Sequence, residues 1–214
     1  MRLLLVRHGE SVANASGVYQ GWYDSPLSAL GERQALATAR AIAARADLRP
    51  FAVYASPLAR AWDTGAAIAT AVGLTPLAHA GLREINVGAA TGLHYTVARE
   101  RWPELEEQRQ ALGLDHGWPE GETGREFGAR VAAALEEIIA RHLAEEEDGA
   151  QSAEAAVVLA SHGGTIRFAL AHLRGDSANV WPHDPVGNCS IAEVQITAAG
   201  RRVLTIDRGE HLIE

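Results

Sequence analysis

The sequence predicts an α/β fold with three layers, in which a mostly parallel central sheet lies between helices and carries a small cap insertion. Short apolar runs without alternation occur at residues 2–6 and 155–161, and such runs are typical of strands buried on both faces of a parallel sheet. Segments with apolar residues at helical spacing follow the strands. This alternation of strands and helices is typical of α/β proteins.

The composition narrows the protein class. The 214 residues, 47% of them hydrophobic, suffice for one core, so we expect a single domain over residues 1–214. A net charge of −8 argues against a broad nucleic-acid or anionic-membrane surface, so any anion site must be local. The single cysteine, Cys189, cannot form an internal disulfide, and no targeting or membrane-spanning segment is evident. We therefore expect a cytoplasmic protein that binds neither nucleic acid nor membrane.

The first half of the chain repeats a strand, a loop and a helix. Ser28 is of the residue type that caps helix N-termini, and apolar or alanine positions then recur at helical spacing. Pro57 breaks the second apolar run, and Gly73 is a natural helix stop. We expect a strand at 2–6, a helix at 28–46, a strand at 51–56 and a helix at 58–72.

The second half begins with a segment of different composition. Residues 81–128 are rich in Gly, Pro, Trp and charge, which is typical of short helices and loops that cap a site. The acidic, small-residue stretch 144–155 predicts a solvent-exposed loop. We expect the other elements to be a helix at 125–142, a strand at 155–161, a helix at 165–175, and a hairpin of 190–197 and 201–207 with its turn at 198–200.

Two predicted strands end alike, in LLLVRHG and in VVLASHGG. The site of an open α/β sheet lies beyond the carboxyl ends of its strands, so His8 and His162 should meet at one edge. The strand at 51–56 brings Arg60 toward the same edge, alongside Arg7. Two arginines and two histidines near helix N-termini favour a dianionic ligand, and a tetrahedral phosphoryl group fits better than a single carboxylate.

Each motif alone is weak, because an isolated histidine at a strand end is more often structural. Together, RHGE, SPLxR (residues 56–60) and SHGG follow one order at suitable spacing. This set resembles the histidine phosphatase superfamily, also called the phosphoglycerate mutase-like family, over essentially the whole chain. The resemblance implies that His8 is the nucleophile that forms a phosphohistidine. It implies that Arg7, Arg60 and His162 hold the phosphoryl group.

The resemblance also implies a general acid. LREINVG supplies Glu84, followed by Gly88 and by TGL at 91–93, in the family's pattern. Glu84 would have to be protonated in the first step and then act as a base toward water. Because Arg83 would favour the carboxylate, we expect it to point away. The alternative for Glu84 is an acid of a surface loop.

Other positions are expected to contact substrate. The loop with Gln20, Gly21 and Ser25 either faces the substrate or is an ordinary turn, and the two interpretations have equal weight. The aromatic residues near the site are more often packing residues than part of a pocket wall; they are Trp22, Tyr23, Trp102 and Trp118. Glu122 and Thr123 are expected to cap the next helix, and Cys189 to be a buried small residue. The family chemistry implies no metal and no cofactor, and the other histidines lack metal-ligand spacing. The expected substrate-binding set is Asn14, Gln20, Gly21, Gly163 and Asn188.

The favoured function is that of a metal-independent phosphatase of a small phosphorylated metabolite, either a sugar phosphate or a phosphoglycerate-type compound. A cofactor-dependent phosphoglycerate mutase uses the same core residues and is the alternative. The cap lacks the long insertion and the basic run that enclose the mutase intermediate, and RWPELEEQ is acidic. A non-catalytic phospho-ligand binding module is least favoured, because the whole nucleophile set is present. An open, shallow cap would instead favour a protein phosphatase.

The sequence leaves the biological context less defined. High Ala, Gly and Arg content indicates a high-GC bacterial gene, and analogy alone adds glucosyl-phosphoglycerate to the substrates considered. The expected partner is a small phosphate ester. The oligomeric state stays open, with a homodimer as one alternative.

Overall fold

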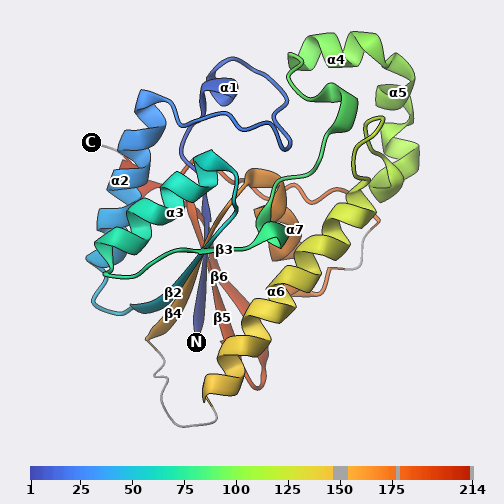
Figure 1. The fold of residues 1–214 in the computed structure, drawn as a ribbon. Coiled ribbons are helices and arrows are strands. Elements are labelled where there is room, and N and C mark those ends of the chain that lie inside the picture. The colour runs from blue at the N-terminus through green and yellow to red at the C-terminus, as the bar shows by residue number, and fades with distance from the viewer. Residues whose placement is uncertain (147–153, 177–178, 213–214) are drawn as a thin grey trace.

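A six-stranded sheet forms the centre of the molecule, with strand order β3-β2-β4-β1-β5-β6 (Figure 1). The computed structural model describes residues 1–146, 154–176 and 179–212. Strand β4 pairs in parallel with β1 and β2, and β2 pairs in parallel with β3. The β1–β5 and β5–β6 pairs are antiparallel, so the predicted, mostly parallel sheet is confirmed. The strands are β1 (Arg2–Arg7), β2 (Arg49–Ala55), β3 (Leu77–Ala78), β4 (Ala155–Ser161), β5 (Ile191–Thr197) and β6 (Gly200–Arg208).

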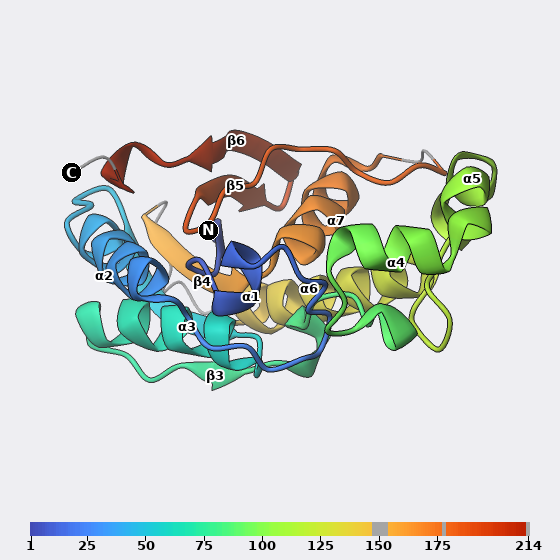
Figure 2. The ribbon, with the colours of Figure 1, turned by 90° about the horizontal axis from the view of Figure 1, so that it is seen from above.

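Helices cover both faces of the sheet, as the predicted three-layer architecture requires (Figure 2). Helices α2 and α3 pack together on one face, and α6 and α7 pack together on the other. Helices α4 and α5 belong to the cap segment, beside one end of α6 (Figure 1). The α-helices are α1 (Val12–Ala15), α2 (Ala29–Ala43), α3 (Ala59–Ala71), α4 (Tyr95–Arg101), α5 (Pro103–Leu112), α6 (Gly124–Glu146) and α7 (Gly163–Arg174).

The apolar run of β1 is buried on both faces of the sheet. Leu3 and Leu5 join the core cluster formed with α6 and α7. Leu4 and Val6 join the cluster formed with α2 and α3. Successive side chains of a strand point to opposite faces, so a central strand between two helical layers requires apolar residues at every position.

Local signals explain several helix ends. Ser28 caps α2 as expected, and its Oγ accepts a hydrogen bond from Gly31 N at 3.1 Å. Helix α7 closes at Gly175, whose left-handed φ of 75° is unstrained only for glycine. The predicted hairpin of β5 and β6 is present. Leu58, expected inside a helix, is the N-cap of α3.

The structure differs from the expected elements at a few points. Residues 144–146, predicted as loop, continue α6, and 147–153 lie outside the described residues. Helix α6 begins at Gly124, inside the expected cap segment, and Thr123 caps it by exchanging hydrogen bonds with Glu126. Glu122 does not cap α6 but forms an ion pair with Arg130, which corrects that expectation. Helix α1, strand β3 and the 3-10 turns at 80–82, 88–90, 113–115 and 210–212 were not predicted.

Among the helices that the structure describes, none has the length and apolar character needed to cross a bilayer.

The loop after β1 is pressed against the start of α2. A Cβ built on Gly31 would lie 2.0 Å from the carbonyl oxygen of Glu10, and one on Gly9 would lie 2.3 Å from that of Gly31. Ser28 N donates to Glu10 O at 2.8 Å, and Ser28 Oγ donates to Glu10 Oε1 at 2.7 Å. These contacts fix the backbone that follows His8, and they require glycine at both positions.

We predict that Gly31→Ala destabilises the protein. Alanine favours a helix by about 1 kcal/mol over glycine, but the clash with Glu10 forces a backbone shift that costs about 1–3 kcal/mol or more. Urea unfolding should show a lower midpoint. The control, Arg33→Ala on the exposed face of α2, should change the unfolding free energy by less than about 0.5 kcal/mol. Equal stability of Gly31→Ala and the native protein would contradict the close approach.

Candidate active site

Three adjacent strands deliver polar residues to one edge of the sheet. Just beyond β1, His8 N donates to Ser161 O at 2.9 Å, and beyond β2, Ser56 N donates to Ala160 O at 3.0 Å. His162 follows β4 directly and is the N-cap of α7. The rings of His8 and His162 consequently meet edge to face, with centroids 5.1 Å apart.

The His8 ring is positioned with one nitrogen available. Its Nδ1 lies 2.6 Å from Gly9 O, and a carbonyl only accepts, so Nδ1 carries the proton and Nε2 keeps its lone pair. The side chain is 3% exposed. Burial, followed by the charges of Arg60 and Arg7, holds the pKa of His8 well below its usual 6.5. The ring is therefore a neutral imidazole, which is the form that acts as a nucleophile.

The His162 ring has one hydrogen-bonded nitrogen and one buried nitrogen without a partner among the described residues. Its Nε2 lies 2.8 Å from Ser56 Oγ, which already accepts from Leu58 N at 3.3 Å. His162 Nδ1 is buried and has no hydrogen-bond partner among the described residues, so in the tautomer in which Ser56 donates to Nε2, Nδ1 carries a proton that a ligand oxygen can accept. Burial, then Arg60 and His8, also hold the pKa of His162 well below its usual value.

Arg7 and Arg60 bring buried positive charge to the same place. Arg60 is 1% exposed and donates to Tyr23 O at 3.0 Å and to Gly21 O at 2.9 Å. Arg7 donates Nη1 to Val186 O at 2.7 Å. The Nε atoms of both arginines are buried and have no partner among the described residues. Unsatisfied buried donors are costly, and an oxyanion of the ligand would satisfy them.

The carboxylate of Glu84 lies beside the N-terminus of α7. Its Oε2 accepts from Gly164 N at 3.1 Å, and its Oε1 accepts from Ile85 N at 3.0 Å. Arg83 points elsewhere, as expected: its guanidinium lies over the Trp22 ring, 3.7 Å from the centroid, and its Nε donates to Ala80 O. The carboxyl group is thus held by main-chain donors and has no ion pair with its neighbour in the part of the chain described.

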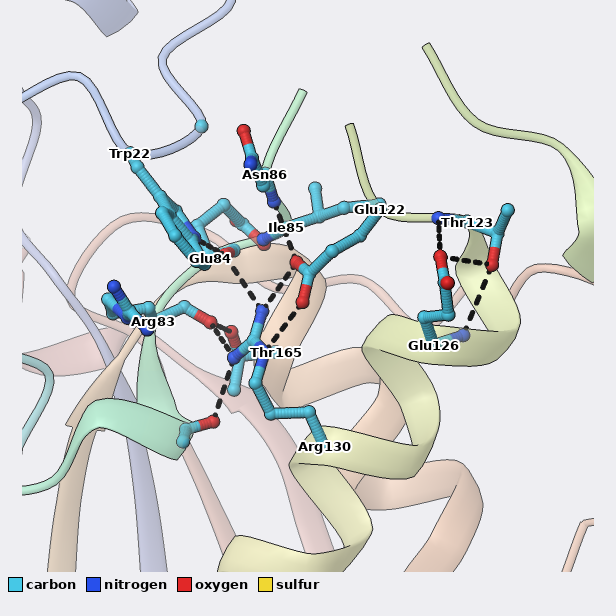
Figure 3. Close-up of polar contacts among 12 residues, drawn as sticks. Trp22, Arg83, Glu84, Ile85, Asn86, Glu122, Thr123, Glu126, Arg130 and Thr165 are labelled. Carbon is cyan, nitrogen blue, oxygen red and sulfur yellow. Dashed lines mark hydrogen bonds and ion pairs between the residues drawn. The ribbon is translucent and has the colours of Figure 1, made fainter. Parts of the chain in front are cut away.

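An ion pair from α6 supports the backbone of Glu84, and Figure 3 shows its contacts. Arg130 Nη2 donates to Glu84 O at 3.1 Å, and Trp22 Nε1 donates to the same oxygen at 2.7 Å. Arg130 Nη1 donates to the carbonyls of residues 81 and 83, and Glu122 binds the guanidinium through both carboxylate oxygens. The sequence did not indicate this role of Arg130, because its partners are main-chain oxygens distant in the chain.

A cavity of about 440 Å³ opens over these groups. Of the expected substrate-binding residues, Asn188 does not line it and instead donates Nδ2 to His8 O at 3.0 Å. Residues that the sequence analysis did not single out also line it, among them Tyr19, Tyr95, Arg99 and Arg167, which come from separate loops and helices. The expected residues on its wall are Arg7, His8, Asn14, Gln20, Gly21, Arg60, Glu84 and Gly163.

Ser11 orients two side-chain amides of this wall. Its N–H donates to Asn14 Oδ1 at 3.2 Å, and its Oγ donates to Gln20 Oε1 at 2.8 Å. Because both amide oxygens are engaged, the Nδ2 and Nε2 groups are presented as donors, and neither has a hydrogen bond to a described residue. Such donors suit phosphoryl oxygens. Ser25 instead accepts from Ala13 N.

The other residues singled out in the sequence have structural surroundings. Trp102 and Trp118 pack with their rings 5.6 Å apart, and Tyr23 is exposed. Cys189 is buried as expected, and burial raises the pKa of its thiol to about 12. In the part of the chain described, no three His, Cys, Asp or Glu residues gather as a metal-ion site would require.

The family follows from comparison with known proteins. The model of a family described as "Histidine phosphatase superfamily (branch 1)" matches residues 3–208. The chain belongs to this superfamily.

Relatives within the superfamily carry different activities in their names. "Probable phosphoglycerate mutase GpmB" of Yersinia enterocolitica is 34% identical over 91% of this chain and 84% of its own length. "Glucosyl-3-phosphoglycerate phosphatase" of Mycobacterium tuberculosis is 32% identical over 85% of this chain and 78% of its own. A solved structure of the mycobacterial glucosyl-3-phosphoglycerate phosphatase with VO3 superposes with a TM-score of 0.85, at 28% identity, over 97% of this chain and 99% of that one. These similarities support a phosphatase-type enzyme.

We predict that His8 and His162 stay neutral at pH 6.0, where a histidine with a pKa of about 6.5 is mostly protonated. Their ¹⁵N side-chain resonances should keep the neutral pattern between pH 7.5 and 6.0, while free histidine in the same buffer titrates. Because the unfolded chain takes up protons below pH 6.5 at these positions and the folded chain does not, they also make the unfolding free energy decrease as pH falls below 6.5. Protonation of either ring at or above pH 6.0 would contradict the prediction.

Proposed function

We propose that the protein is a metal-independent phosphomonoester hydrolase that acts on a small phosphorylated metabolite through a phosphohistidine on His8. The observation that carries this proposal is the state of His8, a buried neutral ring with Nε2 unprotonated, beside a cavity that it shares with Arg7 and Arg60. Buried, unpartnered donors on Arg7, Arg60 and His162 suit the oxygens of a phosphoryl group.

In the first step, Nε2 of His8 attacks phosphorus and the bond between phosphorus and the ester oxygen breaks. Arg7, Arg60 and His162 stabilise the charge on the phosphoryl oxygens, and they are fixed before the reaction starts. Glu84, in its carboxylic acid form, gives its proton to the departing oxygen.

In the second step, Glu84 is a carboxylate and takes a proton from a water molecule as that water attacks phosphorus. The bond between phosphorus and Nε2 breaks, inorganic phosphate leaves, and both His8 and Glu84 return to their starting forms. The same residue thus serves as acid and then as base, which the reversal of roles in the two half-reactions requires.

Transfer of the phosphoryl group to a second substrate oxygen, instead of water, would make the protein a phosphoglycerate mutase. The similarity to the Yersinia protein favours this alternative, and the core residues serve both reactions. The similarity to the mycobacterial phosphatase, in sequence and in fold, favours hydrolysis. We therefore place hydrolysis first.

We predict that the purified protein releases inorganic phosphate from phosphorylated metabolites in the presence of excess chelator. The panel contains sugar phosphates, glycerol 3-phosphate, phosphoserine and 3-phosphoglycerate, and released phosphate is measured colorimetrically. His8→Ala should remove release, because no other group forms the covalent intermediate. His172→Ala, a change at the far end of α7, is the control and should keep the native rate.

Three outcomes separate the candidates. Phosphate release that His8→Ala abolishes supports the hydrolase. Interconversion of 2- and 3-phosphoglycerate without release, tested in the same samples, would move the assignment to a mutase. Release that survives His8→Ala at near-native rate would refute the nucleophile assignment.

We predict that Glu84→Gln slows formation of the phosphoenzyme from alkyl phosphates much more than from an aryl phosphate. Loss of a general acid lowers the rate about 10²- to 10⁴-fold when the leaving group needs a proton. Nitrophenolate leaves without a proton, so its rate should change little. Formation of the phosphoenzyme from glycerol 3-phosphate and from p-nitrophenyl phosphate is followed by rapid quench. Equal losses with both substrates would show that Glu84 is not the proton donor.

A further inference from the structure

The active-site cavity holds more positive charge than one phosphoryl group requires. Its lining contains the arginines 7, 60 and 167, and among the described residues that line it the only carboxylate is that of Glu84. Arg7 and Arg60, with the two histidines, suffice for a phosphoryl dianion. In a chain whose net charge is −8, such a local excess indicates a ligand with a second anionic group.

Arg167 is placed to receive that group. It lies on α7, one turn beyond Gly163, and it is half-buried. A Cβ built on Gly163 would lie 3.4 Å from Arg167 Nη1 and 3.4 Å from Arg7 Nε. The two guanidinium groups thus flank the bare α-carbon of Gly163, on the wall of the cavity. The terminal nitrogens of Arg167 have no hydrogen bond to any described residue, so they are available to a ligand.

One segment, residues 184–186, holds both guanidinium groups in place. Arg167 Nε donates to Asp184 O at 2.8 Å, and Arg7 Nη1 donates to Val186 O at 2.7 Å. The carboxylate of Asp184 is in turn bound through both oxygens by Arg174, at 2.9 and 2.8 Å. Main-chain oxygens therefore fix the orientation of Arg167 and leave its outer edge open.

This arrangement brings like charges together. The charge of Arg167 is among the causes that lower the pKa of Arg7, after burial. Like charges near one another are unfavourable unless an anion binds between them. The terminal nitrogens of a single guanidinium form a planar fork, which matches the two oxygens of a carboxylate.

We propose that Arg167 binds a carboxylate on the leaving-group side of the substrate, so that the substrates are phosphate monoesters of hydroxy acids. This inference rests on the proposed function, since it assigns the phosphoryl group to Arg7, Arg60 and the histidines. It names a specificity residue that neither the RHG nor the SHG motif contains.

The test compares two ligands that differ only at the carboxylate. 3-Phosphoglycerate and glycerol 3-phosphate share a carbon skeleton, and the second carries a hydroxymethyl group where the first has the carboxylate. Their dissociation constants are measured by calorimetry on His8→Ala protein, which binds without turnover. With Arg167 present, 3-phosphoglycerate should bind about tenfold or more tightly than glycerol 3-phosphate, as expected for a charge-assisted hydrogen bond pair.

Further variants in the same background identify the residue responsible. Arg167→Met should remove the preference while glycerol 3-phosphate still binds. Arg167→Lys keeps the charge without the fork and should keep part of the preference, which a merely structural role would not predict. Arg141→Met, an exposed change on α6, is the control and should leave the ratio unchanged.

The proposal is overturned if the two ligands bind equally with Arg167 present, if neither binds, or if Arg167→Met weakens both by the same factor. Hydrolysis is measured separately on the native protein. Binding with the predicted preference but no phosphate release from any ester would refute the hydrolase and leave the carboxylate site standing.

Discussion

The parallel pairing of β4 between β1 and β2 places the ends of three strands side by side, and the rest of the site depends on it. The main-chain hydrogen bonds continue one residue beyond the strands, at His8 and Ser56. The His8 ring, the proposed nucleophile, is therefore positioned by the sheet and not by a loop. Groups fixed in this way need little reorganisation when charge develops on the phosphoryl oxygens.

Buried positive charge is the second constraint. Arg60 is almost fully buried, and its cost is offset by the carbonyl oxygens of residues 21 and 23, which neutralise part of the charge but leave Nε unpaired. Burial, reinforced by this charge, holds the pKa values of His8 and His162 well below the usual value and keeps both rings neutral. Burial and the two arginines thus account for both parts of the proposed mechanism, an anion site and an unprotonated nucleophile.

The residues proposed to face the leaving group are held by elements other than the strand ends. Arg130 of α6, held by Glu122, braces the backbone of Glu84 (Figure 3). The main-chain oxygen of Asp184 orients Arg167 on the first turns of α7. Proteins similar to this chain are named as mutases and as phosphatases.

The sequence by itself determined the strands other than β3, the helices that flank the sheet, and the meeting of His8 and His162 at one edge. Continuous apolar runs have one stable place, inside a sheet covered on both faces, and topology then carries His8 and His162 to one edge. Only the tertiary structure decided the roles of Asn188, Glu122, Arg130 and Arg167. Their partners are backbone atoms or side chains far along the chain. A local sequence pattern does not predict such contacts, because they form only when the cap, α6 and α7 pack together.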